Sequence, residues 1–364
     1  MPIYLVMKHK IGFLRVITKP VPFFVVITSY MFLSMHVSMI RKAYISVICA
    51  TLPLLVSCEK NNLPDNIDYR QEMRDFVIGI SDYARNTEPG FIVIPQNGQE
   101  LVTNNGETDG TLESAYLAAI NAVGREDLFY GYNRDEEATP ASEMQYMLDY
   151  CLLYEQNSVE VLVTDYCSTH IKMDDSYARN NTNGFISFAA DNRDLNDIPG
   201  YPAVPYSVNN DDIQTVADAK NFLYLINGEK YNTKQEFIHA VSATDYDLII
   251  IDLFHDNVAF TAQEIAGLKL KKNGGKRLVI CYMSIGEAED YRYYWNTIWL
   301  KNQPEWLYKE NPDWEGNYKV WYWDPEWQSL IYGNNDAYLD RIMAAGFDGV
   351  YLDIIDAFEY YEDL

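Results

Sequence analysis

Acidic or polar side chains recur at the ends of short apolar and β-branched runs in this sequence. In chain order, such runs end at or near Asn97, Asp165, Asp252, Asp324, Asp353 and Asp356. Two carboxyl groups that face one another can serve as general acid and as base or nucleophile in a hydrolysis. Since the carboxyl ends of parallel strands share one edge of a sheet, we expect these ends to form a common site.

The densest such segment is VICYMSIGEAEDYRYYWNTIW, from Val279 to Trp299. Here an apolar run breaks into a turn rich in acids and aromatics. Glu287 in this turn is a candidate for either carboxylate role, and Tyr282 for stacking on a ring-shaped substrate. Arg292 is expected to pair with Glu287 or Glu289 rather than to contact substrate.

Motifs for other chemistries are absent from the sequence. It has no Walker loop, no GxGxxG after a strand and no GxSxG elbow, which argues against nucleotide, dinucleotide and serine-hydrolase chemistry. His170, His239 and His255 lack metal-ligand spacing, and the cysteines after residue 58 (Cys151, Cys167 and Cys281) form no CxxC pair. Hydrolysis by carboxylates remains, without metal or cofactor.

The charge is unevenly distributed. Residues 1–57 hold six Lys or Arg and no Asp or Glu, so the rest of the chain has 22 basic against 53 acidic residues, a net charge of −31. Binding to nucleic acid or to an anionic membrane surface depends on Lys and Arg contacts. Nucleic-acid binding is therefore excluded as a function class, and the charge suits a soluble secreted protein.

The N-terminal region is interpreted as a targeting signal, residues 1–57. Met39 is followed by a basic pair, then by the apolar run AYISVICATLPLL, and LVSC has the pattern that precedes a lipidated cysteine. We expect Met39 to be the true start and Cys58 to carry the lipid. The protein would then be an extracytoplasmic, membrane-anchored bacterial lipoprotein, on the outer membrane or cell surface.

Residues 58–364 are expected to form a single domain. Strand-like runs alternate with helix-like patterns, which favours a (β/α)8 TIM-like barrel over an open sheet. Nine strand candidates compete for eight barrel positions, so GFISFAA or NFLYLIN is expected to be peripheral. The strand YKVWYWD, ending at Asp324, is counted among the barrel strands.

Long motifs in the C-terminal half are similar to one family. They are SIGEAEDYRYYW, PEWL, NPDWEGNYKVWYWDPEWQ and GFDGVYLDIIDAFEYY. They resemble the bacterial and archaeal branch of glycoside hydrolase family 114, the endo-α-1,4-polygalactosaminidase type, almost continuously from about Asn221 to Tyr361. The resemblance implies a TIM-like barrel that cleaves a galactosamine-containing polysaccharide.

The order of segments departs from that family. In its members, the segment resembling YLDIIDAFEYY lies mid-chain and precedes segments that resemble residues 69–190 of this protein. Here residues 69–190 come first, 191–212 are a linker rich in Pro, Asn and Asp, and 213–364 follow. This order implies a circular permutation, which a closed barrel tolerates because its first and last strands are neighbours.

Glycoside cleavage needs two carboxyl groups across the scissile bond. Asp353 ends an apolar strand and matches the family's acidic motif, and Glu126 in GREDLFYGY matches the position of the other active-site glutamate. We assign Glu126 as general acid and Asp353 as nucleophile or base, with exchangeable roles. The residues expected to bind substrate are Asn97, Tyr130, Asp165, Tyr166, Asp252, Tyr282, Glu287, Trp323, Asp324 and Asp356. For the aromatic ones, core packing is the alternative.

Three classes of function remain open. The first is a lipid-anchored glycoside hydrolase acting on an amino-sugar polymer. The second is a non-catalytic glycan-binding lipoprotein on the same barrel, and the third is an interaction or scaffold protein. The expected partners are a polysaccharide and, through Cys58, a membrane.

Overall fold

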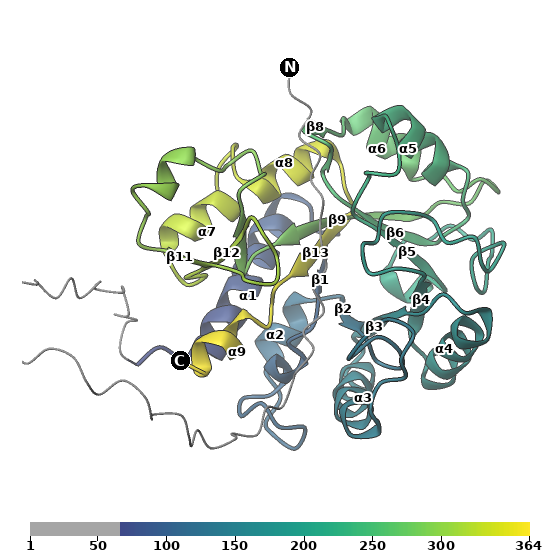
Figure 1. The fold of residues 1–364 in the computed structure, drawn as a ribbon, viewed down its shortest axis with the longest axis horizontal. Coiled ribbons are helices and arrows are strands. Elements are labelled where there is room, and N and C mark those ends of the chain that lie inside the picture. Colours follow the sequence, from purple (N-terminus) through teal and green to yellow (C-terminus); the bar gives the residue numbers. More distant parts are fainter. Residues whose placement is uncertain (1–65) are drawn as a thin grey trace, which may run out of the picture. The chain divides into compact units, whose positions relative to one another are not determined.

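The computed structural model describes residues 66–364, which form one compact unit. Helices lie around the outside and strands at the centre (Figure 1). Met39 and Cys58, on which the targeting prediction rests, lie outside the described residues.

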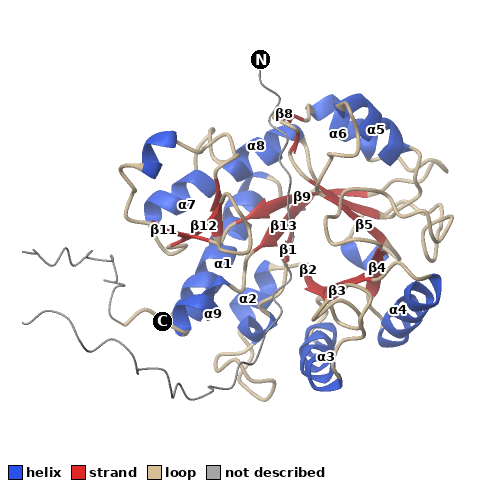
Figure 2. Cartoon of the chain, in the orientation of Figure 1, coloured by secondary structure: helices blue, strands red, loops and turns tan. Residues whose placement is uncertain are grey.

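Eight short strands run parallel in two hydrogen-bonded sheets, drawn in red in Figure 2. In spatial order, the larger sheet contains β1 (Ile92–Pro95), β13 (Gly349–Asp353), β9 (Leu278–Ser284), β6 (Leu248–Ile251) and β5 (Phe222–Leu225), and the smaller contains β2 (Ala122–Glu126), β3 (Glu160–Tyr166) and β4 (Ile186–Ala190). Most of their residues are buried, as is usual for parallel strands covered on both faces. The predicted α/β architecture with a parallel sheet is confirmed.

The two sheets meet along two edges. A parallel bridge joins Gln96 to Gly124, and Asn121 N–H donates to Val93 O at 2.9 Å, so β1 lies beside β2. At the other edge, the rings of Phe188 and Phe222 lie 5.7 Å apart, which brings β4 beside β5. The strands thus follow one another in the order β5, β6, β9, β13, β1, β2, β3, β4.

Three strand predictions need correction. GFISFAA and NFLYLIN contain β4 and β5, so neither is peripheral. YKVWYWD does not join the parallel strands. Its first residues form β12 (Asn317–Val320) in a small antiparallel sheet with β10 (Glu287–Glu289) and β11 (Leu307–Glu310), because this edge pairs with the turn that follows β9. The run EDLFYGY, also a strand candidate, contributes only its first residue, Glu126, to β2, because the chain turns at Asp127, which takes a positive φ of 61°.

Helices alternate with the strands along the chain. They are α1 (Tyr69–Thr87), α2 (Ser114–Ala119), α3 (Ala141–Gln156), α4 (His170–Asn183), α5 (Lys234–Ser242), α6 (Ala262–Leu268), α7 (Pro325–Ile331), α8 (Tyr338–Ala345) and α9 (Ala357–Glu362). Their ends follow from local chemistry: Asp68 caps α1, Thr261 and Glu264 form a capping box on α6, and Gly184 ends α4 with φ 87°. Within residues 66–364, no helix has the length and apolar character needed to cross a membrane.

The two ends of the described chain lie side by side. Arg70 near the start of α1 forms an ion pair with Glu362 at the end of α9, with Nε and Oε1 2.9 Å apart. The rings of Tyr69 and Tyr361 lie 5.5 Å apart, and the Arg70 guanidinium lies over the Phe358 ring. Residues almost 300 positions apart in sequence are therefore neighbours in space.

The passage 191–212 contains no helix or strand, yet it is anchored along its length. Arg193 pairs with Asp127 on the loop after β2 at 2.8 Å. The Tyr206 ring stacks on Tyr177 of α4 at 4.7 Å. Near its end, Asn209 accepts hydrogen bonds from Lys271 Nζ. The passage, which connects β4 to β5, thus packs against the rest of the folded unit along its length.

Candidate active site

Glu126, at the carboxyl end of β2, is held by three donors. Gln96 Nε2 and Tyr166 OH donate to its two carboxylate oxygens, and Asn97 Nδ2 donates to Oε2 at 3.1 Å. Asn97 also accepts from the Glu126 N–H at 3.3 Å, which fixes backbone and side chain together. An ionised carboxylate only accepts hydrogen bonds, so these donors suit the ionised form of Glu126.

Gln96 was missed by the sequence analysis, which chose its neighbour Asn97. Its amide oxygen accepts from Tyr224 OH of β5 at 2.8 Å, so its amide nitrogen is turned toward Glu126. The signal available was its position directly after Pro95, at the end of the buried strand β1. The contact with Tyr224 crosses from β1 to a strand that follows 128 residues later, which no local pattern reveals.

Asp353 ends β13, on the other side of β1 from Glu126. Tyr282 OH donates to its Oδ2 at 2.5 Å, and the Ile354 N–H donates to Oδ1 at 2.8 Å. Burial and the charge of Glu126 raise the pKa of Asp353 to about 7, while the two hydrogen bonds oppose the rise. Glu126 is therefore close enough to influence the ionisation of Asp353.

Asp356 adds a third carboxyl group beside this pair. It is half-buried and directly precedes α9. Burial raises its pKa to about 6, the guanidinium of Arg125 opposes the rise and the charge of Glu126 adds to it. The Arg125 side chain is held by Gln99 Oε1 at 2.8 Å and by the Glu126 carbonyl oxygen at 2.8 Å.

Buried tyrosines lie next to the carboxylates. The hydroxyl of Tyr351 on β13 is buried and has no hydrogen-bond partner among the described residues. It lies against Gly124 of β2, where an added Cβ would meet it at 1.9 Å. A glycine is required there because any side chain would displace the ring of Tyr351. Tyr351, Tyr224 and Tyr166 all lie close to Glu126.

Asp252 takes part in an ion-pair group next to this site. Arg292 Nη1 lies 2.7 Å from Asp252 Oδ2, and Arg292 Nε lies 2.5 Å from Glu289 Oε2. Burial raises the pKa of Asp252, and the charge of Arg292 opposes the rise. Arg292 thus pairs with Glu289 as expected, although not with Glu287, and Asp252 has a protein partner in place of the predicted substrate.

Glu287 lies on β10 of the antiparallel sheet. It is buried, and its Oε1 accepts from Asn311 at 2.8 Å and lies 3.4 Å from Lys319 Nζ. Its Oε2 is buried without a hydrogen-bond partner among the described residues. Glu287 therefore has structural partners on one oxygen, and its role at the site stays a prediction.

Asp165 at the end of β3 is fully buried and fully satisfied. It accepts from the N–H groups of Phe129 and Tyr130 at 2.7 and 3.1 Å, from Ser176 at 2.6 Å and from Asn180 at 3.2 Å. Burial raises its pKa, and these donors oppose the rise. It ties the loop after β2 to α4, so we revise its predicted role from substrate binding to loop anchoring.

Three further candidates also have structural partners. Tyr130 OH donates to Asp175 of α4 at 2.8 Å. The Trp323 ring packs against Tyr69 at 5.1 Å, which is the core-packing alternative. The Asp324 carboxylate caps α7 by accepting from its second residue. The side chains of these three residues are turned toward helices, so each has a structural partner besides its predicted contact with a sugar.

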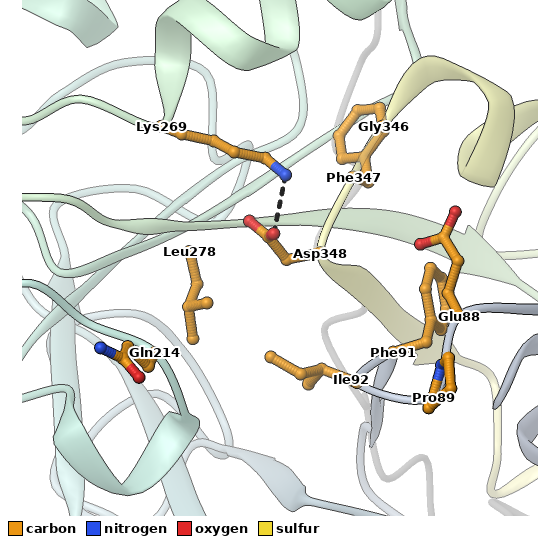
Figure 3. Close-up of a pocket in the computed structure, with 11 residues that line it drawn as sticks. Glu88, Pro89, Phe91, Ile92, Gln214, Lys269, Leu278, Gly346, Phe347 and Asp348 are labelled. Atoms are coloured by element: carbon orange, nitrogen blue, oxygen red, sulfur yellow. Dashed lines mark hydrogen bonds and ion pairs between the residues drawn. The ribbon is translucent and has the colours of Figure 1, made fainter.

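A cavity lies at the other end of the parallel strands. Its volume is about 360 Å³, and it opens at the amino ends of β1, β9 and β13, opposite the carboxylates (Figure 3). It is lined in part by Phe91, Phe347 and the ion pair of Lys269 with Asp348, whose Nζ and Oδ1 are 2.7 Å apart. In α/β barrels, the amino-terminal face contributes stability while the carboxyl-terminal face carries the chemistry. The carboxylate cluster therefore remains the candidate site.

The part of the chain that the structure describes contains no cluster of potential metal ligands. Within residues 66–364, no three His, Cys, Asp or Glu side chains are grouped so that they could hold a metal ion. Cys151, Cys167 and Cys281 are free thiols, all buried.

Comparison with known proteins places residues 207–364 in a family. The model of glycoside-hydrolase family GH114 matches this segment. This segment belongs to GH114. The matched segment includes Asp353 and Tyr282 of the candidate site, whereas Glu126, Gln96 and Tyr166 precede it.

Three curated proteins that are similar to part of this chain are each named as an uncharacterized protein. One from Methanocaldococcus jannaschii is 47% identical over 136 residues, one from Deinococcus radiodurans 41% over 129, and one from Thermotoga maritima 40% over 121. The alignments cover 33–36% of this chain and 36–39% of the relatives. The chain thus matches a little over a third of the length of each relative.

The raised pKa of Asp353 predicts a pH-dependent gain in stability for Asp353→Asn. Aspartate in an unfolded chain has a pKa near 3.9, so the stability linked to Asp353 is complete below about pH 4 and is lost as pH rises through about 7. Asparagine does not titrate. Relative to the wild type, the free energy of unfolding of the variant should rise by about 2–3 kcal/mol between pH 5 and pH 8.

Urea unfolding at both pH values measures this difference. Asp109→Asn is the matched control, because Asp109 is exposed, and its stability relative to wild type should be the same at both pH values. An Asp353→Asn curve that parallels the control would contradict a raised pKa for Asp353.

Proposed function

We propose that this protein is a glycoside hydrolase whose carboxylate pair is Glu126 and Asp353. The observation that carries the proposal is their arrangement on β2 and β13, which flank β1, each with a tyrosine donor, together with the effect of the Glu126 charge on the pKa of Asp353. Glycosidases place two carboxyl groups on either side of the scissile bond. Membership in GH114 supports the same class of reaction.

The protonation of the pair fits this chemistry. With a pKa of about 7, Asp353 holds a proton in mildly acidic solution, while Glu126 accepts hydrogen bonds from Gln96 and Asn97. One protonated and one ionised carboxyl group are what a glycosidase needs at the start of its cycle. Which of them faces the leaving oxygen is set by the substrate's pose, and a leaving-group test assigns the roles.

The substrate we propose is an amino-sugar polymer that contains galactosamine, as the resemblance to the polygalactosaminidase branch implies. The net charge of −31 beyond residue 57 is compatible with a cationic, deacetylated chain. Asp356, whose pKa burial raises to about 6, places a further carboxyl group beside the pair. A non-catalytic glycan-binding protein on the same fold is the alternative function.

Asp353→Asn and Glu126→Gln should each lower the release of reducing ends from a galactosamine polymer by about 10²–10⁴-fold, because each removes one member of the pair. Partly deacetylated and fully acetylated polymers would be compared. The exposed carboxylates Asp109 and Glu107 provide the matched controls Asp109→Asn and Glu107→Gln, which should retain full activity.

An aryl glycoside with a good leaving group separates the two roles. The variant of the general acid should recover most of its activity on this substrate, because the leaving group no longer needs a proton, whereas the other variant should stay inactive. Wild-type binding of the polymer without any release would favour the glycan-binding alternative. Full activity in both variants would exclude this carboxylate pair.

We also infer that the fold is a closed (β/α)8 barrel in circularly permuted order. The ring order of the eight strands and the Phe188–Phe222 contact support closure. The ion pair of Arg70 with Glu362 supports permutation, since the two ends of the described chain would be consecutive in the unpermuted order.

A reordered chain tests this inference. It begins at the exposed Val204, runs to Leu364, continues through a short Gly–Ser linker to Asn66 and ends at Ala203. It should unfold cooperatively and keep the activity of the original chain, because only surface connections change. The same linker opened at Val163, inside the buried strand β3, is the control and should not fold. If neither reordered chain folds, the inference that the two ends of the described chain can be joined is contradicted.

We also propose that Cys58 carries a lipid anchor, because the segment LVSC has the pattern of a lipidated cysteine. Cys58→Ala should abolish incorporation of a labelled fatty acid in a bacterial host and should move the protein from the membrane fraction to the soluble fraction. Cys151→Ala, which changes a buried thiol, is the control and should keep both the label and the membrane fraction. Label retained in Cys58→Ala would contradict lipidation there.

A further inference from the structure

Arg193 connects the passage 191–212 with the loop that carries Glu126. It follows β4 by three residues, and its side chain is about 25% exposed. Nearly all of its donor capacity is used by groups that lie next to Glu126 along the chain or in space. The proposed function makes no use of Arg193 so far.

Asp127, the residue directly after Glu126, is the main partner. Arg193 Nη1 and Nη2 donate to the two oxygens of its carboxylate at 3.2 and 2.8 Å, a bidentate pair. Asp127 has a φ of 61°, and its N–H donates to Thr164 O of β3 at 2.9 Å. The left-handed backbone turns the chain away immediately after Glu126, so the position of Asp127 sets the direction from which Glu126 enters the site.

Two further contacts hold the same loop. Arg193 Nη2 donates to the Gly131 carbonyl oxygen at 2.9 Å, and Nε donates to Asp135 at 2.9 Å. Gly131 has a φ of 121°, and an added Cβ there would meet Asp127 Oδ1 at 2.1 Å. One guanidinium thus joins three points of the segment 127–135, where a point charge such as a lysine ammonium would reach fewer.

The flat face of the Arg193 guanidinium packs against Tyr166, which also contacts Glu126. Its central carbon lies 3.8 Å from the centre of the Tyr166 ring. Tyr166 OH donates to Glu126 Oε1. The same arginine therefore contacts both the residue that follows Glu126 and the tyrosine that donates to its carboxylate.

We propose that Arg193 is a positioning residue for Glu126, and that the passage 191–212 is part of the active site through it. This inference rests on the proposed function for its kinetic effect. Without the guanidinium, Asp127 and Tyr166 lose a shared partner, so two of the residues that limit the movement of Glu126 are held less firmly. Small displacements of a catalytic group cost far more in turnover than in substrate binding.

Arg193→Met and Arg193→Lys test the proposal, with Arg134→Met as the matched control. Arg134 lies on the same loop, is about 76% exposed and pairs with Glu137. We expect kcat to fall by about 10²-fold in Arg193→Met with KM changed less than about threefold, and less severely in Arg193→Lys. The control should keep the wild-type kcat and KM. All assays are run below the temperature at which any variant starts to unfold.

Amide hydrogen exchange over residues 126–139 supplies a readout independent of activity. Exchange there should speed up at least tenfold in Arg193→Met, with α6 and β9 unchanged, and should stay at the wild-type rate in Arg134→Met. Unchanged exchange with an unchanged kcat would overturn the proposal. A kcat lowered only in proportion to the folded fraction, or accompanied by an equal rise in KM, would also overturn it.

The two readouts separate this inference from the proposed function. If the wild type cleaves no glycan, the hydrolase function fails, while local exchange still shows whether Arg193 holds the loop of Glu126. If the wild type is active and neither readout changes in Arg193→Met, the positioning role fails and the hydrolase function stands.

Discussion

Two carboxyl groups beside an apolar, close-packed set of parallel strands are the constraint on which the rest of the structure depends. Removing a carboxylate from water is costly unless hydrogen-bond donors replace its solvation. The fold supplies more hydrogen-bond donors to one of the two carboxyl groups than to the other. Glu126 has three side-chain donors, whereas Asp353 has a tyrosine hydroxyl and one backbone N–H. The less well compensated group therefore keeps its proton up to near-neutral pH.

The donors to the two carboxylates come from several strands. Gln96 follows β1, Tyr166 ends β3, Tyr282 belongs to β9, and Tyr224 of β5 orients Gln96 from across the interior. Parallel strands bring such residues to one end because all of their carboxyl termini point the same way. The site is thus a property of the assembled strands, and any one strand alone would leave its carboxylate without partners.

Charged groups outside the pair show how the same cost is met elsewhere. Lys271 and Asp247 form a fully buried ion pair at 2.8 Å, and Arg292 joins Asp252 to Glu289. In both cases a buried cation compensates the acids. No described cation forms an ion pair with Glu126 or Asp353, which leaves their protonation sensitive to each other and to a bound substrate. This difference separates a structural carboxylate from one available for chemistry.

The sequence by itself determined the parallel α/β class, the family of residues 207–364 and the strand-end positions of Asp353 and Glu126, because apolar runs that end on acids are local patterns. Asp165, Asp324 and Glu287 follow the same pattern, and in the structure their carboxylates accept hydrogen bonds from α4, from the first turn of α7 and from Asn311 next to β11. Only the tertiary structure decided which strand-end acids face each other and which donors reach them. Gln96 meets Tyr224, and Arg193 meets Asp127, across 128 and 66 residues. Such contacts depend on which strands become neighbours, and no local spacing encodes that choice.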